Sequence, residues 1–231
     1  MKILGIETST EYCSVALWQD GEVTEKIKLV GQKHSEVLMA MLDELLQQAG
    51  VKLTQLDGIA YGAGPGSFTG VRIACGVTQG LALGADLPVV GICTLQAVAE
   101  GTGKNKVIAA LDARMAEVYF AVYEKRDNEW QTVCAPCLCL PRDAPKVEGM
   151  DWHGAGSGFA AHGDVLQACY EGQLAAIDAV CVPQASSITR IAAPMFAAGL
   201  SVDAALAMPL YLRDKVALKT SERKALEKNS L

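Results

Sequence analysis

Hydrophobic and polar positions in the first thirty residues predict a small antiparallel sheet. Residues 2–6, 13–18 and 22–29 are three runs of β-forming residues, and the pair Asp20-Gly21 between the last two is a hairpin turn signal. Neighbouring strands joined by short turns pair side by side. The sequence therefore begins with a predicted three-stranded meander.

A long helical pattern follows the meander. Apolar residues recur at helical spacing over residues 34–49, and Gly50 is a stop signal. Residues 56–61 predict a further strand, residues 62–66 a glycine-rich loop, and Ser67 the N-cap of a second helix that ends near Gly84. The resulting order is β-β-β-α-β-α.

The rest of the chain predicts a second, less regular half. A strand at 88–92 and a helix at 94–100 precede residues 101–105, whose Gly-Thr-Gly-Lys-Asn sequence is the best candidate for a domain boundary. Two domains, 1–103 and 104–231, are expected, with a C-terminal segment that is a candidate to return to the first domain and a solvated tail. The later elements are predicted as strands at 106–111, 117–123 and 130–140 and helices at 158–170 and 186–198.

Composition limits the functional classes. The chain has 231 residues, 51% of them hydrophobic, and its net charge of -6 gives no basic field that could hold a polyanion. A stand-alone nucleic-acid-binding protein is therefore disfavoured. The first residues lack the pattern of a signal peptide, no apolar stretch has the length of a membrane span, and most of the eight cysteines lie within apolar runs. These features predict a cytoplasmic protein without membrane contact.

The glycine-rich segment at 62–72 is the most informative motif. A turn of this kind between a strand and a helix N-terminus can present backbone N–H groups to an anion, and a plain tight turn is the alternative. The segment lacks the lysine of a Walker A loop and the spacing of a dinucleotide fingerprint. Further along, Gly76, Gly80 and Gly84 share one helix face and predict a close packing partner, either the first helix or another protein.

Other polar groups are candidates for chemistry. Glu7-Thr8-Ser9 follows the first strand and forms either a phosphate or metal turn or, more simply, a chain turn. Cys134, Cys137 and Cys139 resemble half of a zinc site, but no second cluster follows, so no metal site is predicted. His34 is expected to be exposed or to lie at an interface.

Two further segments have structural explanations. The opposite charges of residues 112–119, which include Asp112, Arg114 and Glu117, predict surface ion pairs around a turn. Residues 152–158 predict a second glycine-rich turn, which either lines a cleft or only reverses the chain.

The motifs together resemble one known family. ILGIETS at residues 3–9, YGAGPGSFTGVR at 61–72, QGLA at 79–82, Asp112-Ala113-Arg114 and PLYLR at 209–213 are similar to the bacterial TsaB family, also called YeaZ. The resemblance covers nearly the whole chain and is weakest at 134–185. It implies an α/β, actin-like, Hsp70-like ATPase fold (ASKHA, ribonuclease H-like) with two βββαβα-type halves, the second reduced.

The resemblance also implies a function. TsaB is the non-catalytic partner of the paralogous TsaD in forming threonylcarbamoyladenosine in tRNA, with a TsaE-type ATPase completing the assembly and tRNA held only indirectly. TsaD carries a metal-binding His-x-x-x-His pair where this chain has Thr94 and Val98, which cannot ligate a metal. We therefore expect a scaffold subunit that has no catalytic residues and no metal.

In the TsaB family the first two long helices bind TsaD or, in isolation, a second TsaB copy. The interface implied for this chain comprises Val37, Leu38, Met41, Leu42, Leu45, Phe68, Arg72, Ile73, Gly76 and Gly80. Nucleotide or anion contact is expected at Glu7, Thr8, Ser9, Gly64, Gly66 and Ser67, with no intrinsic cofactor and ATP or ADP a candidate ligand at the complex interface. The alternative is an enzyme: a residual ATPase that uses Glu7, or a protease, for which no catalytic pair is placed.

Overall fold

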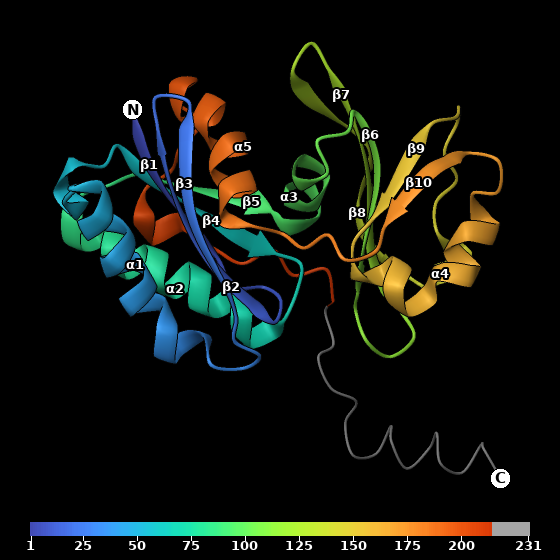
Figure 1. Ribbon diagram of the computed structural model, residues 1–231, viewed down its shortest axis with the longest axis horizontal. Coiled ribbons are helices and arrows are strands. Elements are labelled where there is room, and N and C mark those ends of the chain that lie inside the picture. The colour runs from blue at the N-terminus through green and yellow to red at the C-terminus, as the bar shows by residue number, and fades with distance from the viewer. Residues whose placement is uncertain (214–231) are drawn as a thin grey trace, which may run out of the picture.

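Two five-stranded sheets, each covered by helices, make up the computed structural model, which describes residues 1–213 (Figure 1). The first sheet has the order β3-β2-β1-β4-β5; β1 pairs antiparallel with β2 and parallel with β4. Its strands are β1 (Lys2–Glu7), β2 (Tyr12–Gln19), β3 (Glu22–Leu29), β4 (Gly58–Gly64) and β5 (Val89–Cys93). The predicted meander is confirmed.

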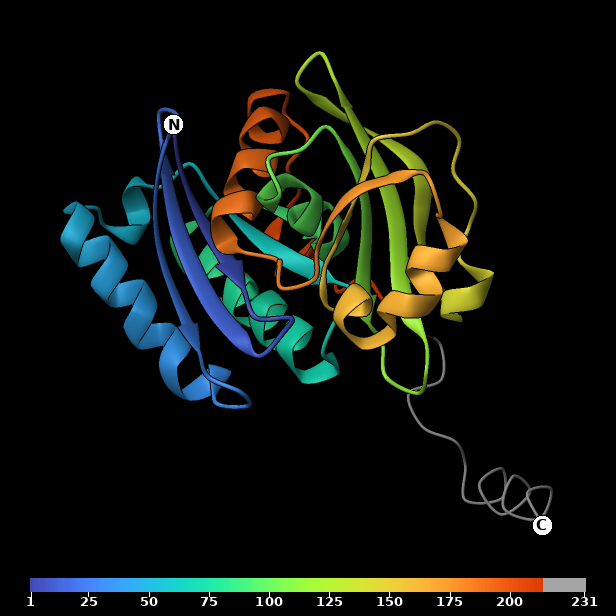
Figure 2. The ribbon, with the colours of Figure 1, turned by 45° about the vertical axis from the view of Figure 1, so that its right-hand side comes forward.

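Helices cover both faces of the first sheet because its central strands are apolar on both sides. Figures 1 and 2 show α1 (His34–Ala49) and α2 (Phe68–Ala85) side by side on one face, and α5 (Ala185–Ala197) on the other. Successive side chains of β1 point to opposite faces of the sheet: Leu4 and Ile6 join the core under α1 and α2, while Ile3 packs with α5.

The second sheet has the order β10-β9-β6-β7-β8. Its strands are β6 (Lys106–Asp112), β7 (Val118–Arg126), β8 (Glu129–Cys139), β9 (Trp152–Ala155) and β10 (Leu174–Asp178). The helix α4 (Ser157–Cys169) covers one face, and α3 (Thr94–Gly101), which lies between the two sheets, supplies Leu95 and Val98 to the core on the other. Residues 140–151, between β8 and β9, contain a single 3₁₀ turn and no α-helix, so the second half is the reduced one, as predicted.

Three sequence predictions need correction. Residues 62–64, expected in a loop, belong to β4. The strands β9 and β10 were not predicted: β9 begins the segment 152–158 that was expected to be only a turn, and four of the five residues of β10 are exposed, which removes the hydrophobic signal. The third concerns the range 104–231, for which a C-terminal segment was expected to return to the first domain: this return already includes α5, which packs on the first sheet, where Thr189 of α5 approaches Gly5 of β1.

The C-terminal segment 207–213, here called the strap, runs from the first domain to the second (Figure 1). The Tyr61 hydroxyl of β4 accepts a hydrogen bond from the Met208 N–H at 2.9 Å, and Leu210 N–H donates to the Ala63 carbonyl at 2.7 Å. The charged tail lies outside the described residues. Within residues 1–213, no helix combines the length and apolar character that crossing a membrane requires.

Candidate functional site

The glycine-rich turn packs directly on the Glu7-Thr8-Ser9 turn. Ser67 caps α2 as predicted, its hydroxyl accepting a hydrogen bond from Gly70 N–H at 3.3 Å. A Cβ atom on Gly70 would lie 2.0 Å from the Thr8 carbonyl oxygen, and one on Gly66 would lie 2.7 Å from Ser9 Cβ. These glycines are therefore required for close contact between two loops, which supports the tight-turn alternative at both positions.

Glu7 lies beneath this contact and is 1% exposed. One carboxylate oxygen accepts a hydrogen bond from Ser9 N–H at 2.5 Å, whereas the other has no partner among the described residues and lies where a Cβ on Gly62 would be. Burial raises the pKa of Glu7 to about 7, against the opposing effect of the hydrogen bonds from Ser9. The carboxyl is thus only partly ionised near pH 7, where an ordinary glutamate is fully charged.

A cleft of about 850 Å³ separates the two domains and is closed on one side by the strap. Of the six residues predicted to contact a nucleotide or anion, Ser9, Gly66 and Ser67 line the cleft. The other three, Glu7, Thr8 and Gly64, are buried and do not line it, so the prediction is wrong for them. The physical reason is that Glu7 and Gly64 end the buried strands β1 and β4, and Thr8 packs on α2, where its hydroxyl donates to the Gly70 carbonyl at 2.7 Å.

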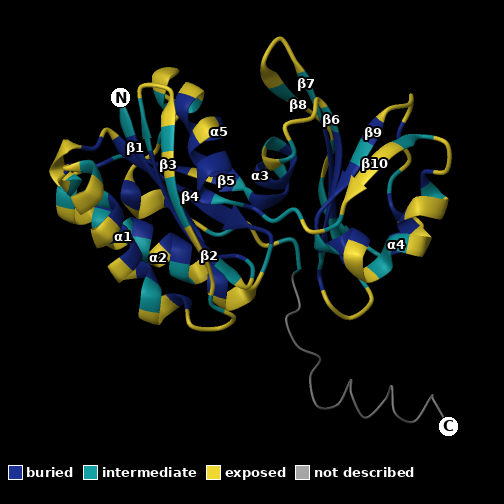
Figure 3. Ribbon diagram, in the orientation of Figure 1, coloured by how far each residue is buried: buried dark blue, intermediate teal, exposed yellow. Residues whose placement is uncertain are grey.

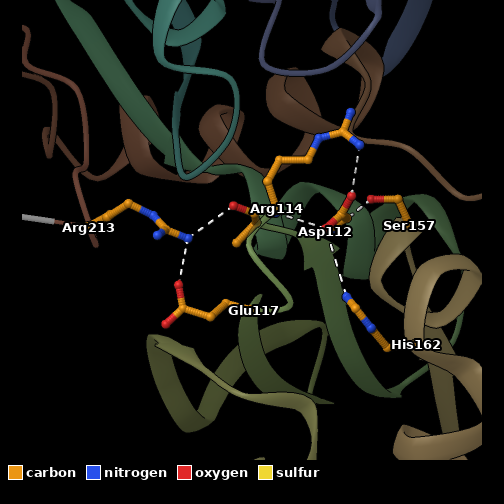
Figure 4. A network of polar contacts seen from close by, with 7 residues as sticks. Asp112, Arg114, Glu117, Ser157, His162 and Arg213 are labelled. Carbon is orange, nitrogen blue, oxygen red and sulfur yellow. Dashed lines mark hydrogen bonds and ion pairs between the residues drawn. The ribbon is translucent and has the colours of Figure 1, made fainter. Parts of the chain in front are cut away.

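The opposite side of the cleft is a polar network at the β6–β7 turn (Figure 4). Arg114 pairs with Asp112 at 3.2 Å and is 88% exposed, which confirms the predicted surface ion pair. Glu117 instead pairs with Arg213 of the strap at 2.8 Å, and Arg213 also donates to the Ala113 carbonyl at 3.0 Å. Asp112 N–H donates to the Ser157 hydroxyl at the start of α4 at 3.1 Å. The strap thereby holds the turn.

The predicted partner interface divides into two groups. Leu38, Met41, Leu42 and Leu45 are between 0% and 8% exposed and pack against the first sheet. Their assignment to an interface is wrong, because α1 needs its wide apolar stripe to cover its own domain. His34 is also buried, at 5%, and its Nε2 lies 3.1 Å from the Tyr12 carbonyl oxygen, which corrects the expectation of an exposed histidine.

The second group lies on the outward surfaces of α1 and α2, which Figure 3 shows to be largely exposed. Gly76 and Gly80 face open space: outside their own helix, no atom of residues 1–213 lies within 4 Å of a Cβ built on either. Exposed apolar residues of the two helices include Leu83, which is 62% exposed, and Met39, which is 51% exposed. We call this surface the α1/α2 face; its exposed residues are Met39, Phe68, Arg72, Gly76, Gly80 and Leu83, while Val37 and Ile73 are partly buried and also pack against the core of the first domain.

Sequence reasoning did not find the role of the strap. Tyr211 contacts both Phe68 and Arg72 at the start of α2, and Arg213 reaches the second domain. The available signal was an aromatic residue and an arginine within the short apolar run PLYLR, directly before a charged tail. Their partners lie between 96 and 143 residues away in sequence, so spacing could not reveal them.

The residues at the two candidate metal positions pack in the protein interior. Thr94 and Val98 are fully buried, and the Thr94 hydroxyl donates to the Pro65 carbonyl. Cys134, Cys137 and Cys139 lie on β8, partly buried against the core of the second domain. Within residues 1–213, no group of three or more His, Cys, Asp or Glu residues is placed to hold a metal ion.

Two halves, each built from a meander followed by parallel strands and helices, with a cleft between them, define an actin-like ATPase (ASKHA) fold. Residues 23–220 match the sequence model of TsaD, described as tRNA N6-adenosine threonylcarbamoyltransferase. The chain belongs to the TsaB family, also called YeaZ.

Relatives and a solved structure match it over nearly the full length. The "tRNA threonylcarbamoyladenosine biosynthesis protein TsaB" of Escherichia coli K12 is 42% identical, covering 95% of this chain and 97% of the relative. The protein of that name from Haemophilus influenzae is 36% identical, with coverage of 95% and 96%. The structure of YeaZ from Pseudomonas aeruginosa superposes with a TM-score of 0.85 at 37% identity, covering 91% of this chain and 99% of that chain.

Proposed function

We propose that this chain is a non-catalytic subunit required for the formation of threonylcarbamoyladenosine in tRNA, and that it binds and stabilises a TsaD-type transferase. The full-length similarity to proteins named for this pathway supports the proposal. A match to the TsaD sequence model over residues 23–220 supports a paralogous relation, in which two related subunits present equivalent helices to each other.

We also propose that the chain itself has no catalytic activity. The residues that would carry it are committed to packing: Glu7 is buried under Gly62, and Thr94 and Val98 lie in the core. A metal ligand or a general base needs access to the substrate, which these positions lack. We expect the transferase activity to belong to the partner.

The observation that carries the proposal is the unoccupied α1/α2 face. Glycine in a helix interior costs roughly 1 kcal/mol relative to alanine, and here Gly76 and Gly80 approach no other segment among residues 1–213. Bare backbone beside exposed Leu83 on the same helix is suited to close packing by a foreign helix. We assign this face to the TsaD-type subunit and, in isolation, to a second copy of the chain.

Three further assignments follow from the same proposal. A TsaE-type ATPase is expected to join the complex, ATP or ADP to bind at the complex interface, and tRNA to be held mainly by the other subunits. The net charge of -6 agrees with the last point, because phosphate contacts require a surplus of basic groups. We place this assembly in the cytoplasm.

The test is the solution mass of this protein mixed with its TsaD-type partner, measured by size-exclusion chromatography with light scattering. Wild type is expected to form a one-to-one complex, and Gly76→Trp to lower the affinity by about a hundredfold or more by filling the space a partner helix would need. Ala168→Trp, at an exposed position of α4, is the matched control and should bind normally.

Two results would contradict the proposal. If the two wild-type proteins elute separately at low and high salt, with and without ATP, the TsaD-type protein is not a binding partner of this chain. Normal binding by Gly76→Trp would place the interface elsewhere. Leu42→Arg is unsuitable as a probe, because Leu42 is 3% exposed and a buried arginine would unfold the first domain.

A further inference from the structure

Arg72 is an isolated charge on the α1/α2 face. It is the only charged residue of α2, and α1 contains no lysine or arginine. Arg72 lies one helical turn before Gly76, so the two residues share a side of α2. A single cation on a helix that has no other charged residue can determine where and in which direction a partner helix docks.

The guanidinium of Arg72 is fixed by two aromatic rings. Its central carbon lies 3.5 Å from the ring centre of Phe68 and 5.6 Å from that of Tyr211, whose ring centres are 5.8 Å apart. Arg72 Nε–H donates to the Tyr211 hydroxyl at 2.7 Å. Because Nε is used in this way, the group is anchored at one edge, and its rotation over the Phe68 ring is restricted.

The two terminal nitrogens of Arg72 remain available. Among residues 1–213, neither Nη1 nor Nη2 forms a hydrogen bond or ion pair, and the side chain is exposed. A guanidinium edge with two parallel N–H groups matches the two oxygens of a carboxylate. Since the aromatic rings already hold the side chain, binding would cost less conformational entropy than it would for a free surface arginine.

We propose that Arg72 is a preformed binding site for one carboxylate side chain of the protein partner, at the end of the α1/α2 face nearest the strap. The inference rests on the proposed function and specifies the chemistry of its interface. It also makes Tyr211 a positioning residue, because its hydroxyl orients the guanidinium without contacting the partner's carboxylate.

A protein carboxylate fits the site better than a nucleic-acid phosphate. Phosphate backbones are held by several basic residues in succession, and neither interface helix offers a second lysine or arginine. The surroundings of Arg72 are Phe68, Tyr211 and the glycine surface of α2, which suit an interface that excludes water around one charge pair.

The experiment measures the affinity of the full-length protein for its TsaD-type partner at low and high salt. Arg72→Gln should weaken binding about tenfold to a hundredfold, because it removes the charge and leaves an acid unpaired. Arg72→Lys should recover only part of this loss, since an ammonium cannot form the two-pronged contact. Tyr211→Phe should have a smaller effect, and Arg190→Gln on α5, across the first sheet, should have none.

The outcomes separate the inference from the function on which it rests. If wild type binds its partner and Arg72→Gln binds equally well, the carboxylate site is wrong and the proposed function stands. If wild type does not bind, the proposed function itself fails. If Arg72→Gln lowers affinity for tRNA but not for the protein partner, the site recognises phosphate and the inference is overturned.

Discussion

At the scale of single residues, Glu7 shows why chemical type alone does not define a site. A carboxylate with two hydroxyl residues after a strand is typical of a phosphate or metal turn, yet Glu7 is 1% exposed and its second oxygen has no partner among the described residues. Its burial depends on Gly62, a residue of another strand, which leaves room for the carboxyl group. The environment makes this acid a core residue.

This burial predicts that stability depends on pH. The pKa of Glu7 is raised from 4.5 to about 7 in the folded protein, so between these values the folded state binds a proton that the unfolded state has lost. The contribution is therefore fully present below pH 4.5 and declines as the pH rises to about 7. Glu7→Gln mimics the neutral carboxyl and should remove this decline, raising stability at pH 8 by about 2–3 kcal/mol.

Denaturant unfolding of both proteins from pH 5 to 8 would measure the effect. Asp203→Asn is a control for the loss of one acid on the surface, since Asp203 is exposed. An identical decline in wild type and Glu7→Gln would show that Glu7 is charged in the folded protein and does not cause the pH dependence.

At the scale of elements, α2 contains glycines with opposite environments. Gly70 in the first turn touches the backbone of Thr8, whereas Gly76 and Gly80 touch nothing outside their own helix in the described part of the chain. The repeat of four residues in the sequence correctly places Gly76, Gly80 and Gly84 on one face. Whether that face packs on α1 or stays open depends on how the two helices lie on the sheet.

The contrast predicts opposite effects of the same substitution. Gly70→Ala should destabilise the protein by about 3 kcal/mol, because the added Cβ would lie 2.0 Å from the Thr8 carbonyl oxygen. Gly76→Ala should stabilise it by up to about 1 kcal/mol through helix propensity alone. Thermal and urea unfolding of the two variants would measure both changes, and a loss of stability in Gly76→Ala would mean that this helix face is already packed.

At the scale of the whole molecule, the strap links the proposed partner surface to the second domain. Tyr211 supports Arg72 on α2, and two residues later Arg213 holds Ala113 and Glu117. The turn it holds contains Arg114, Met115 and Ala116 in successive left-handed conformations, with φ of 62°, 55° and 58°. Non-glycine residues adopt this conformation at a cost, so contacts from outside the turn are needed to keep it.

Loss of the contact between Arg213 and Glu117 is expected to loosen the β6–β7 turn of the second domain. Arg213→Ala should lower stability by about 1–3 kcal/mol, because it removes a charge-assisted hydrogen bond to Glu117 from a side chain that is 15% exposed. Hydrogen exchange should become faster in residues 113–117 and stay unchanged in β1–β3. Arg126→Ala, which removes the ion pair of exposed Arg126 with Glu124, is the control. Equal hydrogen exchange of residues 113–117 in the two variants would show that the strap does not hold this turn.

Much of the fold could be predicted because its signals are local. The meander, α1, α2 and the Ser67 cap follow from hydrophobic period, turn residues and capping chemistry within a few positions. The strand β10 could not be predicted in this way. It is short and mostly exposed, and its parallel partner β9 lies about twenty residues away. Local patterns carry no information about such pairing.

The sequence by itself determined the order of elements in the first half, the family and many of the residues from which the site is built. Tertiary structure decided which of those residues are accessible. Helical period identifies Leu42 and Gly76 equally well, but only the packing of α1 on the first sheet buries the former and leaves the latter open. Likewise, Arg72 becomes an oriented cation only when the chain returns 139 residues later to bring Tyr211 against it. Exposure and orientation depend on contacts between distant segments, and residue type and spacing do not encode them locally.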